Sequence, residues 1–134
     1  MERLLSWETH LNDHIEKWRN VTFKWGQYDC ALFCLYAEKA MCGASRFEDF
    51  IGQYKSAAGS AKALMKFGGG SLADTVAQRL QECDIMTARR GDVALIDTSD
   101  GDALALVIGD KVAAMGHTGL VFFPISAAKK CWRV

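Results

Sequence analysis

Residues 23–34, FKWGQYDCALFC, carry the local signals that decide the fold of this 134-residue chain. Gly26 permits a tight turn that other residue types resist, and Asp29 is a residue type that caps the N-terminus of a helix. From Cys30 onward the sequence CALFCLYAEKAM is apolar on nearly every side, which is typical of a buried helix. We therefore predict a central buried helix that begins at Cys30 and ends at Gly43.

The segment before this turn, residues 6–19, is predicted to form an amphipathic helix with Ser6 as its N-cap. Within it, His10 and His14 lie one helical turn apart, a spacing at which two imidazoles can share a metal ion. Two imidazoles fall short of the usual ligand count, and the sequence offers no third ligand nearby. We therefore expect no metal site and no cofactor.

Residues 44–87 are predicted to be helical and rich in loops. SAAGSAKALMKF suggests a helix that ends in the three glycines at 68–70, and SLADTVAQRLQE (71–82) suggests another that opens with a Ser71–Asp74 capping box. A glycine-rich loop before a helix can bind phosphate. This one lacks the lysine of a P-loop and follows no strand, so we interpret it as a connector.

After residue 88 the pattern changes to short β-strands. GDVALI (91–96) and ALALVI (103–108) are separated by the turn signal TSDGD, and Gly109–Asp110 is typical of a tight hairpin. KVAAM, LVFFPI and KCWRV follow. The chain is thus predicted to be one α+β domain, residues 1–134, with a helical N-terminal half packed on a C-terminal meander of four or five antiparallel strands.

Composition narrows the classes of function. The formal net charge is zero, which gives no broad electrostatic attraction to nucleic acid or to an anionic membrane. No apolar run is long enough to span a bilayer, and the charged N-terminus has no signal-peptide core, so we expect synthesis in a cytoplasm. The five cysteines are odd in number and irregularly spaced, so free thiols are expected.

Among the five cysteines, Cys30 has the position that favours a reactive, nucleophilic thiol. A thiolate is stabilised in the first turn of a helix, because the helix dipole and the free N–H groups there attract negative charge. A cysteine enzyme also needs a histidine base, a polar group that orients the base, and donors for the oxyanion. The other cysteines are expected to pack as small apolar residues; they are Cys34, Cys42, Cys83 and Cys131.

The motif F-x-W-G-x-x-D-C at the start of a central helix, R-G-D-V opening a sheet, and a hairpin through V-I-G-D-K-V together resemble the NlpC-type papain-like cysteine peptidase superfamily. The closing W-R-V and the glycine-rich middle resemble, more narrowly, the short NlpC-like proteins of tailed-bacteriophage tail-tip and baseplate gene clusters. The similarity covers nearly the whole chain. It implies a papain-like fold and cleavage of peptide bonds in peptidoglycan, or processing within the tail tip.

The resemblance also implies a site. In the superfamily a cysteine attacks the peptide carbonyl, a histidine that opens the second core strand is the base, and a polar residue on the next strand orients it. Matched on the V-I-G-D turn, the position of the base falls at Ala103, which has no basic side chain. The remaining candidates are His117, one strand later, with Asp102 or Asp92 as its neighbour.

The catalytic candidates are therefore Cys30, His117 and Asp102. The candidate substrate-binding residues, in the segment that presents the cysteine, are Trp25, Gln27 and Asp29.

Three functions remain open from the sequence. The first is a cell-wall hydrolase of a phage tail tip, and the second is a catalytically silent tail-tip or baseplate component on the same fold. The third is a cytoplasmic amidase or toxin-like thiol enzyme unrelated to phage. Under the first two hypotheses the expected partners are other tail-tip proteins, with peptidoglycan as a further partner of the hydrolase, and the expected location is the virion after synthesis in the host bacterial cytoplasm.

Overall fold

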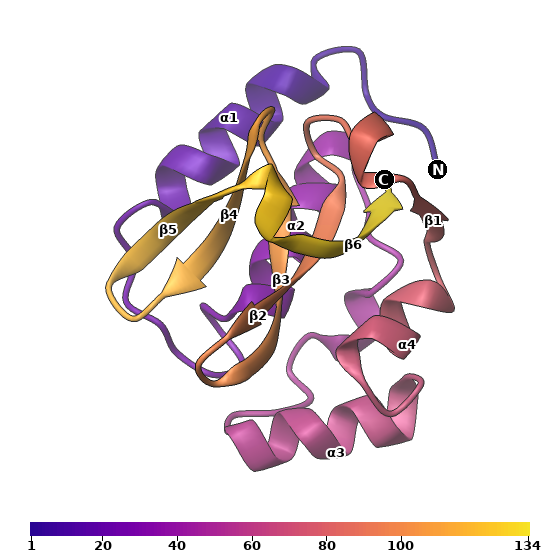
Figure 1. Cartoon of the computed structure of the whole chain (residues 1–134). Helices are drawn as coiled ribbons and strands as arrows, with labels where there is room; N and C mark the ends of the chain where they lie inside the picture. Colours follow the sequence, from indigo (N-terminus) through magenta and orange to yellow (C-terminus); the bar gives the residue numbers. More distant parts are fainter.

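The computed structural model describes residues 1–134 and confirms the predicted α+β class (Figure 1). The α-helices are α1 (Trp7–Trp18), α2 (Cys30–Cys42), α3 (Ala57–Phe67) and α4 (Leu72–Ala77). The strands are β1 (Gln81–Cys83), β2 (Val93–Thr98), β3 (Gly101–Val107), β4 (Lys111–Gly116), β5 (Gly119–Pro124) and β6 (Ala128–Arg133). Short 3-10 helices are η1 (Glu48–Phe50), η2 (Ile85–Thr87) and η3 (Ile125–Ala127). None of the helices has the length and apolar character needed to cross a membrane.

Helix α2 begins and ends where the sequence predicts, and local hydrogen bonds explain both ends. The carboxylate of Asp29 accepts the N–H of Leu32 at 2.9 Å, which makes it the N-cap. At the other end Gly43 adopts a left-handed conformation with φ of 83°, and its N–H donates to the carbonyl of Lys39. The helix is central to the core, and Phe33 within it has no exposed surface.

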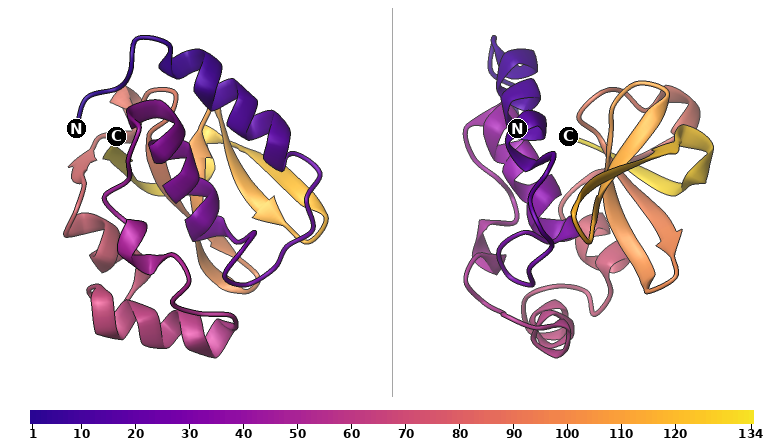
Figure 2. Two further views of the ribbon diagram at one scale, coloured as in Figure 1. Left: turned by 180° about the vertical axis from the view of Figure 1, so that it is seen from behind. Right: turned by 90° about the vertical axis from the view of Figure 1, so that its left-hand side faces the viewer.

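Helix α1 also forms as predicted with Ser6 as its N-cap residue, but the side chain of Ser6 makes no capping bond. The hydroxyl of Ser6 makes no bond to the backbone of the first turn and instead lies 3.0 Å from Nε2 of His10. Helix α1 lies alongside α2 (Figure 2). Its apolar stripe joins the main core cluster, and Leu11 is fully buried there. Burial of this stripe, rather than a cap, therefore stabilises α1.

Helix α4 is shorter than predicted. The hydroxyl of Ser71 accepts the N–H of Asp74 at 3.1 Å, so the predicted cap is present. The helix nevertheless ends at Ala77 rather than at Glu82, because residues 81–83 form β1 and pair with β6. Pairing with a distant strand outweighs the local helical pattern here.

The sheet has six strands in the order β1-β6-β2-β3-β4-β5, and every neighbouring pair is antiparallel. The predicted meander is present from β2 to β5. The prediction of four or five strands in simple succession is wrong for the rest, because β6 returns to the free edge of β2 and β1 then pairs with β6. The strand at the end of the chain is thus an inner strand.

The two faces of the sheet are buried in different ways. One face packs on α1 and α2, which lie together on one side of the curled sheet (Figure 2). It contributes Leu95, Leu104, Leu106 and Trp132. The opposite face holds a second apolar cluster, which is covered by the curl of the sheet and by η2 and η3. Trp132 is 0% exposed, because β6 is an inner strand.

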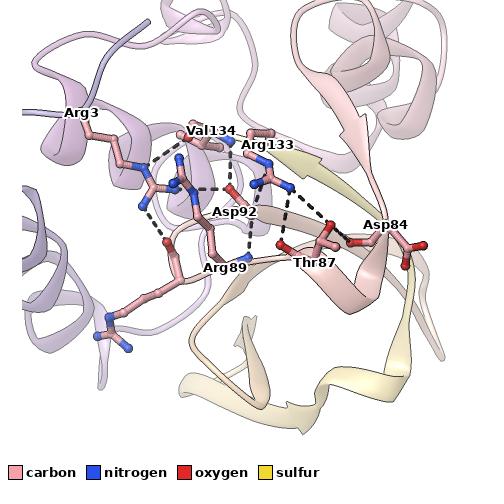
Figure 3. A network of polar contacts seen from close by, with 8 residues as sticks. Arg3, Asp84, Thr87, Arg89, Asp92, Arg133 and Val134 are labelled. Atoms are coloured by element: carbon pink, nitrogen blue, oxygen red, sulfur yellow. Dashed lines mark hydrogen bonds and ion pairs between the residues drawn. The ribbon is translucent and has the colours of Figure 1, made fainter.

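A network of polar contacts joins the two ends of the chain to the start of β2 (Figure 3). The buried carboxylate of Asp92 accepts the N–H groups of Val134 at 3.0 Å and of Arg89 at 2.9 Å, and it pairs with the guanidinium of Arg3 at 3.3 Å. The same guanidinium donates to the carbonyls of Val134 and Arg90. We call this arrangement of Arg3, Asp92 and Val134 the terminal clasp.

Candidate active site

The turn before α2 holds Cys30 in place through the carboxylate of Asp29. Oδ1 accepts the N–H of Leu32, while Oδ2 accepts the N–H of Gly26 at 2.9 Å and the hydroxyl of Tyr54 at 2.7 Å. Asp29 is 1% exposed. Because three donors occupy both oxygens in the interior, Asp29 fixes the start of α2. This differs from the prediction that Asp29 binds substrate.

Tyr54 is a part of the site that the sequence analysis missed. It lies 25 residues after Asp29, and no local signal connects the two. Burial raises the pKa of the Tyr54 hydroxyl, and the neighbouring carboxylate of Asp29 raises it further. The hydroxyl therefore stays protonated and remains a hydrogen-bond donor to Asp29.

Cys30 is half-buried at the N-terminus of α2, where the sequence places it. The pKa of its thiol is raised to about 11, chiefly by burial. Backbone N–H groups, including that of Leu104, act to lower this pKa, and the charge of Asp29 acts to raise it. The sequence argument from the helix dipole favoured a lowered pKa, and desolvation outweighs that effect here. With this pKa, roughly one Cys30 thiol in ten thousand is ionised at pH 7.

Cys30 lies where β3 has no strand partner on one side. Strands β3 and β4 pair only through Leu106 with Ala113 and Val107 with Val112, so the first half of β3 is unpaired on that side. The backbone N–H of Leu104, in this unpaired half, acts on the Cys30 sulfur together with the N–H of Ala31. These N–H groups therefore favour the thiolate, although their effect on the pKa is smaller than that of burial.

The strand beside Cys30 supplies no base. Leu104 belongs to the apolar cluster on the face that packs against α2, whereas Ala103 packs in the cluster on the opposite face. Since side chains alternate along a strand, a histidine at position 103 would point away from α2. The expected position of the base is therefore on the wrong face of β3 in this chain.

His117 lies in the two-residue turn between β4 and β5, and its side chain is exposed. Its backbone carbonyl accepts the N–H of Phe23 at 3.0 Å, so this turn is attached to the segment that leads to Cys30. The His117 imidazole itself makes no hydrogen bond to Cys30 or to any other group. The structure therefore brings the two chain segments together but not the two candidate catalytic side chains.

The two aspartates proposed to orient a base have other partners. Asp102 is exposed on β3 and accepts a bond from Nζ of Lys129 at 2.7 Å, and the same ammonium bonds Asp97 at 2.8 Å. Asp92 belongs to the terminal clasp. Neither carboxylate bonds to His117, which differs from the predicted Cys30–His117–Asp102 arrangement.

Trp25 and Gln27 keep the accessibility that a binding role requires. Trp25 is 38% exposed and packs edge-on against Phe23, with ring centroids 5.1 Å apart. Gln27 is exposed in the same turn. Of the three residues predicted to bind substrate, these two remain available on the surface.

A small apolar cavity lies under α2, between the helix, η1, α3, α4 and the sheet. Its volume is about 50 Å³, and its walls include Ala31, Cys34, Tyr54 and Leu104. Cys30 is not among the lining residues. The cavity is therefore a packing gap behind the site, with room for only a few atoms.

The two histidines of α1 point to different partners. Nε2 of His14 lies 2.9 Å from the carbonyl of Phe33 and its ring stacks on that side chain, whereas His10 contacts Ser6. Burial lowers the pKa of His14 to about 4. Nowhere in the chain do three histidine, cysteine, aspartate or glutamate side chains gather as a metal site.

Comparison with known families gives one finding. The model of a family described as "Domain of unknown function (DUF6950)" matches residues 2–134, nearly the whole chain. No curated protein matches.

Proposed function

The chain belongs to the DUF6950 family, whose function is unknown, and we propose that it is a catalytically silent structural component of a bacteriophage tail tip or baseplate. The observation that carries the silent role is that no imidazole is hydrogen-bonded to the Cys30 thiol, whose pKa is raised to about 11 by burial. The tail-tip role rests on the resemblance of the F-x-W-G-x-x-D-C and V-I-G-D-K-V motifs to NlpC-like proteins.

Three observations support this proposal over a hydrolase. Asp29, beside the thiol, is fully used as a helix cap. The face of β3 next to Cys30 presents Leu104, an apolar side chain. The imidazole of His117 is exposed and unbonded. A nucleophile of this kind depends on an adjacent base or a lowered pKa, and the site supplies neither.

A cysteine hydrolase is the second candidate, and one observation favours it. The backbone N–H groups of Leu104 and Ala31, at the start of a helix, act to lower the pKa of the Cys30 thiol against the larger effect of burial. Donors in this position can stabilise an oxyanion once a substrate carbonyl is bound. Under this alternative, substrate binding displaces water and brings His117 to the thiol.

The two candidates are separated by incubating the purified protein with peptidoglycan sacculi from pH 5 to 9 under reducing conditions. Released peptides are measured by liquid chromatography and mass spectrometry. We expect no release by the wild-type chain, by Cys30→Ala or by Cys42→Ser, a control at the half-buried end of the same helix. Release that persists in Cys42→Ser and disappears in Cys30→Ala would overturn the silent role.

Alkylation by iodoacetamide gives a second, independent measurement. With a pKa of about 11, Cys30 should react at pH 7 about a hundred times more slowly than free cysteine, and the rate should rise tenfold per pH unit up to pH 10. Peptide mass spectrometry assigns the reacted residue. A rate that already reaches a plateau below pH 8 contradicts the neutral thiol on which the proposal rests.

We expect a protein partner to bind at the edge strand β5. It pairs only with β4, and its side chains Val121 and Phe122 are 44% and 37% exposed. Under this proposal a phage encodes the chain, and in that phage Phe122→Asp is expected to reduce tail assembly, whereas Cys30→Ala leaves assembly and infectivity intact. Met65→Asp is the matched control, because Met65 is exposed on α3, away from the sheet. Assembled but non-infectious Cys30→Ala particles would refute the silent role.

A further inference from the structure

Two of the cysteines that the site does not use lie directly opposite each other in the sheet. In the pairing of β1 with β6, Cys83 is the register partner of Cys131. Directly opposed residues of an antiparallel pair have Cα atoms about 4.5–5.5 Å apart. Disulfides bridge Cα atoms about 4.4–6.8 Å apart, so the backbone already lies within the range that a disulfide requires.

The two side chains also lie on the same face of the sheet. Cys131 is fully buried in the apolar cluster on the face opposite α2, and Cys83 packs against that cluster. The Cys83 thiol is close enough to act on Cys131: burial, and after it the charge of Cys83, raise the pKa of Cys131 to about 11. No backbone movement is therefore needed to bring the sulfurs onto one side.

The pair differs from the other cysteines in accessibility and in position. Cys83 is half-buried at the outer edge of the sheet, so a small oxidant can reach it, while Cys131 is protected behind it. Cys30 and Cys34 lie one turn apart on a single buried helix, and Cys42 is at that helix's far end. Only Cys83 and Cys131 are opposed across two strands.

We propose that Cys83 and Cys131 form a redox pair, which a small-molecule disulfide oxidises to a cross-strand disulfide that ties the edge strand β1 to β6. The Cys83 thiolate attacks the oxidant, such as oxidised glutathione, to give a mixed disulfide and one glutathione thiol. Cys131 then displaces the second glutathione. In sum, two protein thiols lose two electrons and two protons, and one glutathione disulfide becomes two glutathione thiols.

The cross-link has a structural consequence. β1 is three residues long and has one neighbour, so it is the least secured strand of the sheet. A bond between residues 83 and 131 closes a loop that contains most of β2 to β6 and so restricts the unfolded chain. Thiols stay reduced in a reducing cytoplasm, so the bond forms only on transfer to an oxidising medium.

The test equilibrates the full chain with oxidised glutathione in excess and digests it with trypsin after blocking free thiols. We expect one linked product that joins peptide 80–89, which holds Cys83, to peptide 131–133, which holds Cys131. The oxidised chain should melt about 5–10 °C above the reduced chain. Cys83→Ser should abolish both effects, and Cys42→Ser should abolish neither.

Three results would overturn the proposal. One is the absence of the linked peptides at equilibrium, and a second is a linked product that joins a different pair of cysteines. The third is a stable glutathione adduct on Cys83 that Cys131 does not resolve, since that would place the two sulfurs out of reach. Because Cys83 is half-buried, Cys83→Ser is expected to fold, and the melting curve of the reduced variant checks this.

Discussion

The hydrogen bonds of Asp29 predict a specific pattern of stability losses. Asp29→Asn keeps the shape of the side chain but replaces one acceptor oxygen with an N–H₂ donor. If the amide oxygen stays with Leu32, the new donor faces the N–H of Gly26 and the hydroxyl of Tyr54. The hydroxyl can rotate and accept, whereas the N–H of Gly26 cannot, so one buried donor is left unpaired.

The magnitudes follow from the number of bonds lost. An unpaired buried donor costs about 1–3 kcal/mol, and a bond to a charged group contributes about 1.5–3 kcal/mol. We expect Asp29→Asn to lower the free energy of unfolding by about 2–3 kcal/mol and Tyr54→Phe by about 1.5–2 kcal/mol. Asp29→Ala leaves three donors unpaired and is expected to cost about 4 kcal/mol or more, a large share of the stability of a domain.

The assay is urea denaturation under reducing conditions, followed by tryptophan fluorescence and far-UV circular dichroism. Asp84→Asn is the control, because Asp84 is an exposed cap of η2 that accepts one N–H, from Met86, and its loss should stay below about 1 kcal/mol. The double variant Asp29→Asn with Tyr54→Phe should show a coupling energy of about 1 kcal/mol. A loss below about 0.5 kcal/mol for Asp29→Asn would refute the structural role of this carboxylate.

Three further substitutions test other parts of the fold. Gly26→Ala places a Cβ against the carbonyl oxygen of Tyr54, at φ of 78°, and should lower the free energy of unfolding by more than about 2 kcal/mol in urea denaturation. Gly109→Ala is the control: its φ is 85°, but no atom lies within 4 Å of the new Cβ, so the loss should be only about 1 kcal/mol. Burial lowers the pKa of His14 to about 4 from 6.5, so the unfolded chain binds its proton more readily. The free energy of unfolding should fall by about 3 kcal/mol as the pH drops from about 6.5 to 4, and a His14→Gln variant that kept this dependence would contradict the assignment. Arg3→Met should lower the free energy of unfolding by about 2–3 kcal/mol, because it removes the donor for buried acceptors of the terminal clasp. Equal urea midpoints for the variant and the wild type would argue against this role of Arg3.

The sequence predicts well those features that depend on neighbouring residues. The start of α2 at Cys30 and its end at Gly43 follow from a cap and a glycine that lie next to the helix. The hairpin at Gly109–Asp110 follows from the same kind of local turn chemistry. These elements form independently of the strand order, so the pattern alone identifies them.

Features that depend on distant pairing are not predictable in this way. The insertion of β6 beside β2 buries Trp132, although the residue lies near the end of the chain in a short apolar segment. The bond from Tyr54 to Asp29 similarly joins residues whose sequence positions carry no common signal. The raised pKa of Cys30 depends on how tightly the sheet packs around the thiol, which a helix-start motif does not report.

The terminal clasp determines how the fold would respond to a mechanical load. Arg3 and Val134 are in contact, so a pulling force applied between the two ends acts on neighbouring points of the molecule. The force first opens the bonds of Arg3, then peels Leu4 from the carbonyl of Met41 and draws β6 out from between its neighbours. Because these bonds break one after another rather than all at once, the fold should unfold at low force. In single-molecule pulling experiments β6 should be the first strand to detach from the sheet.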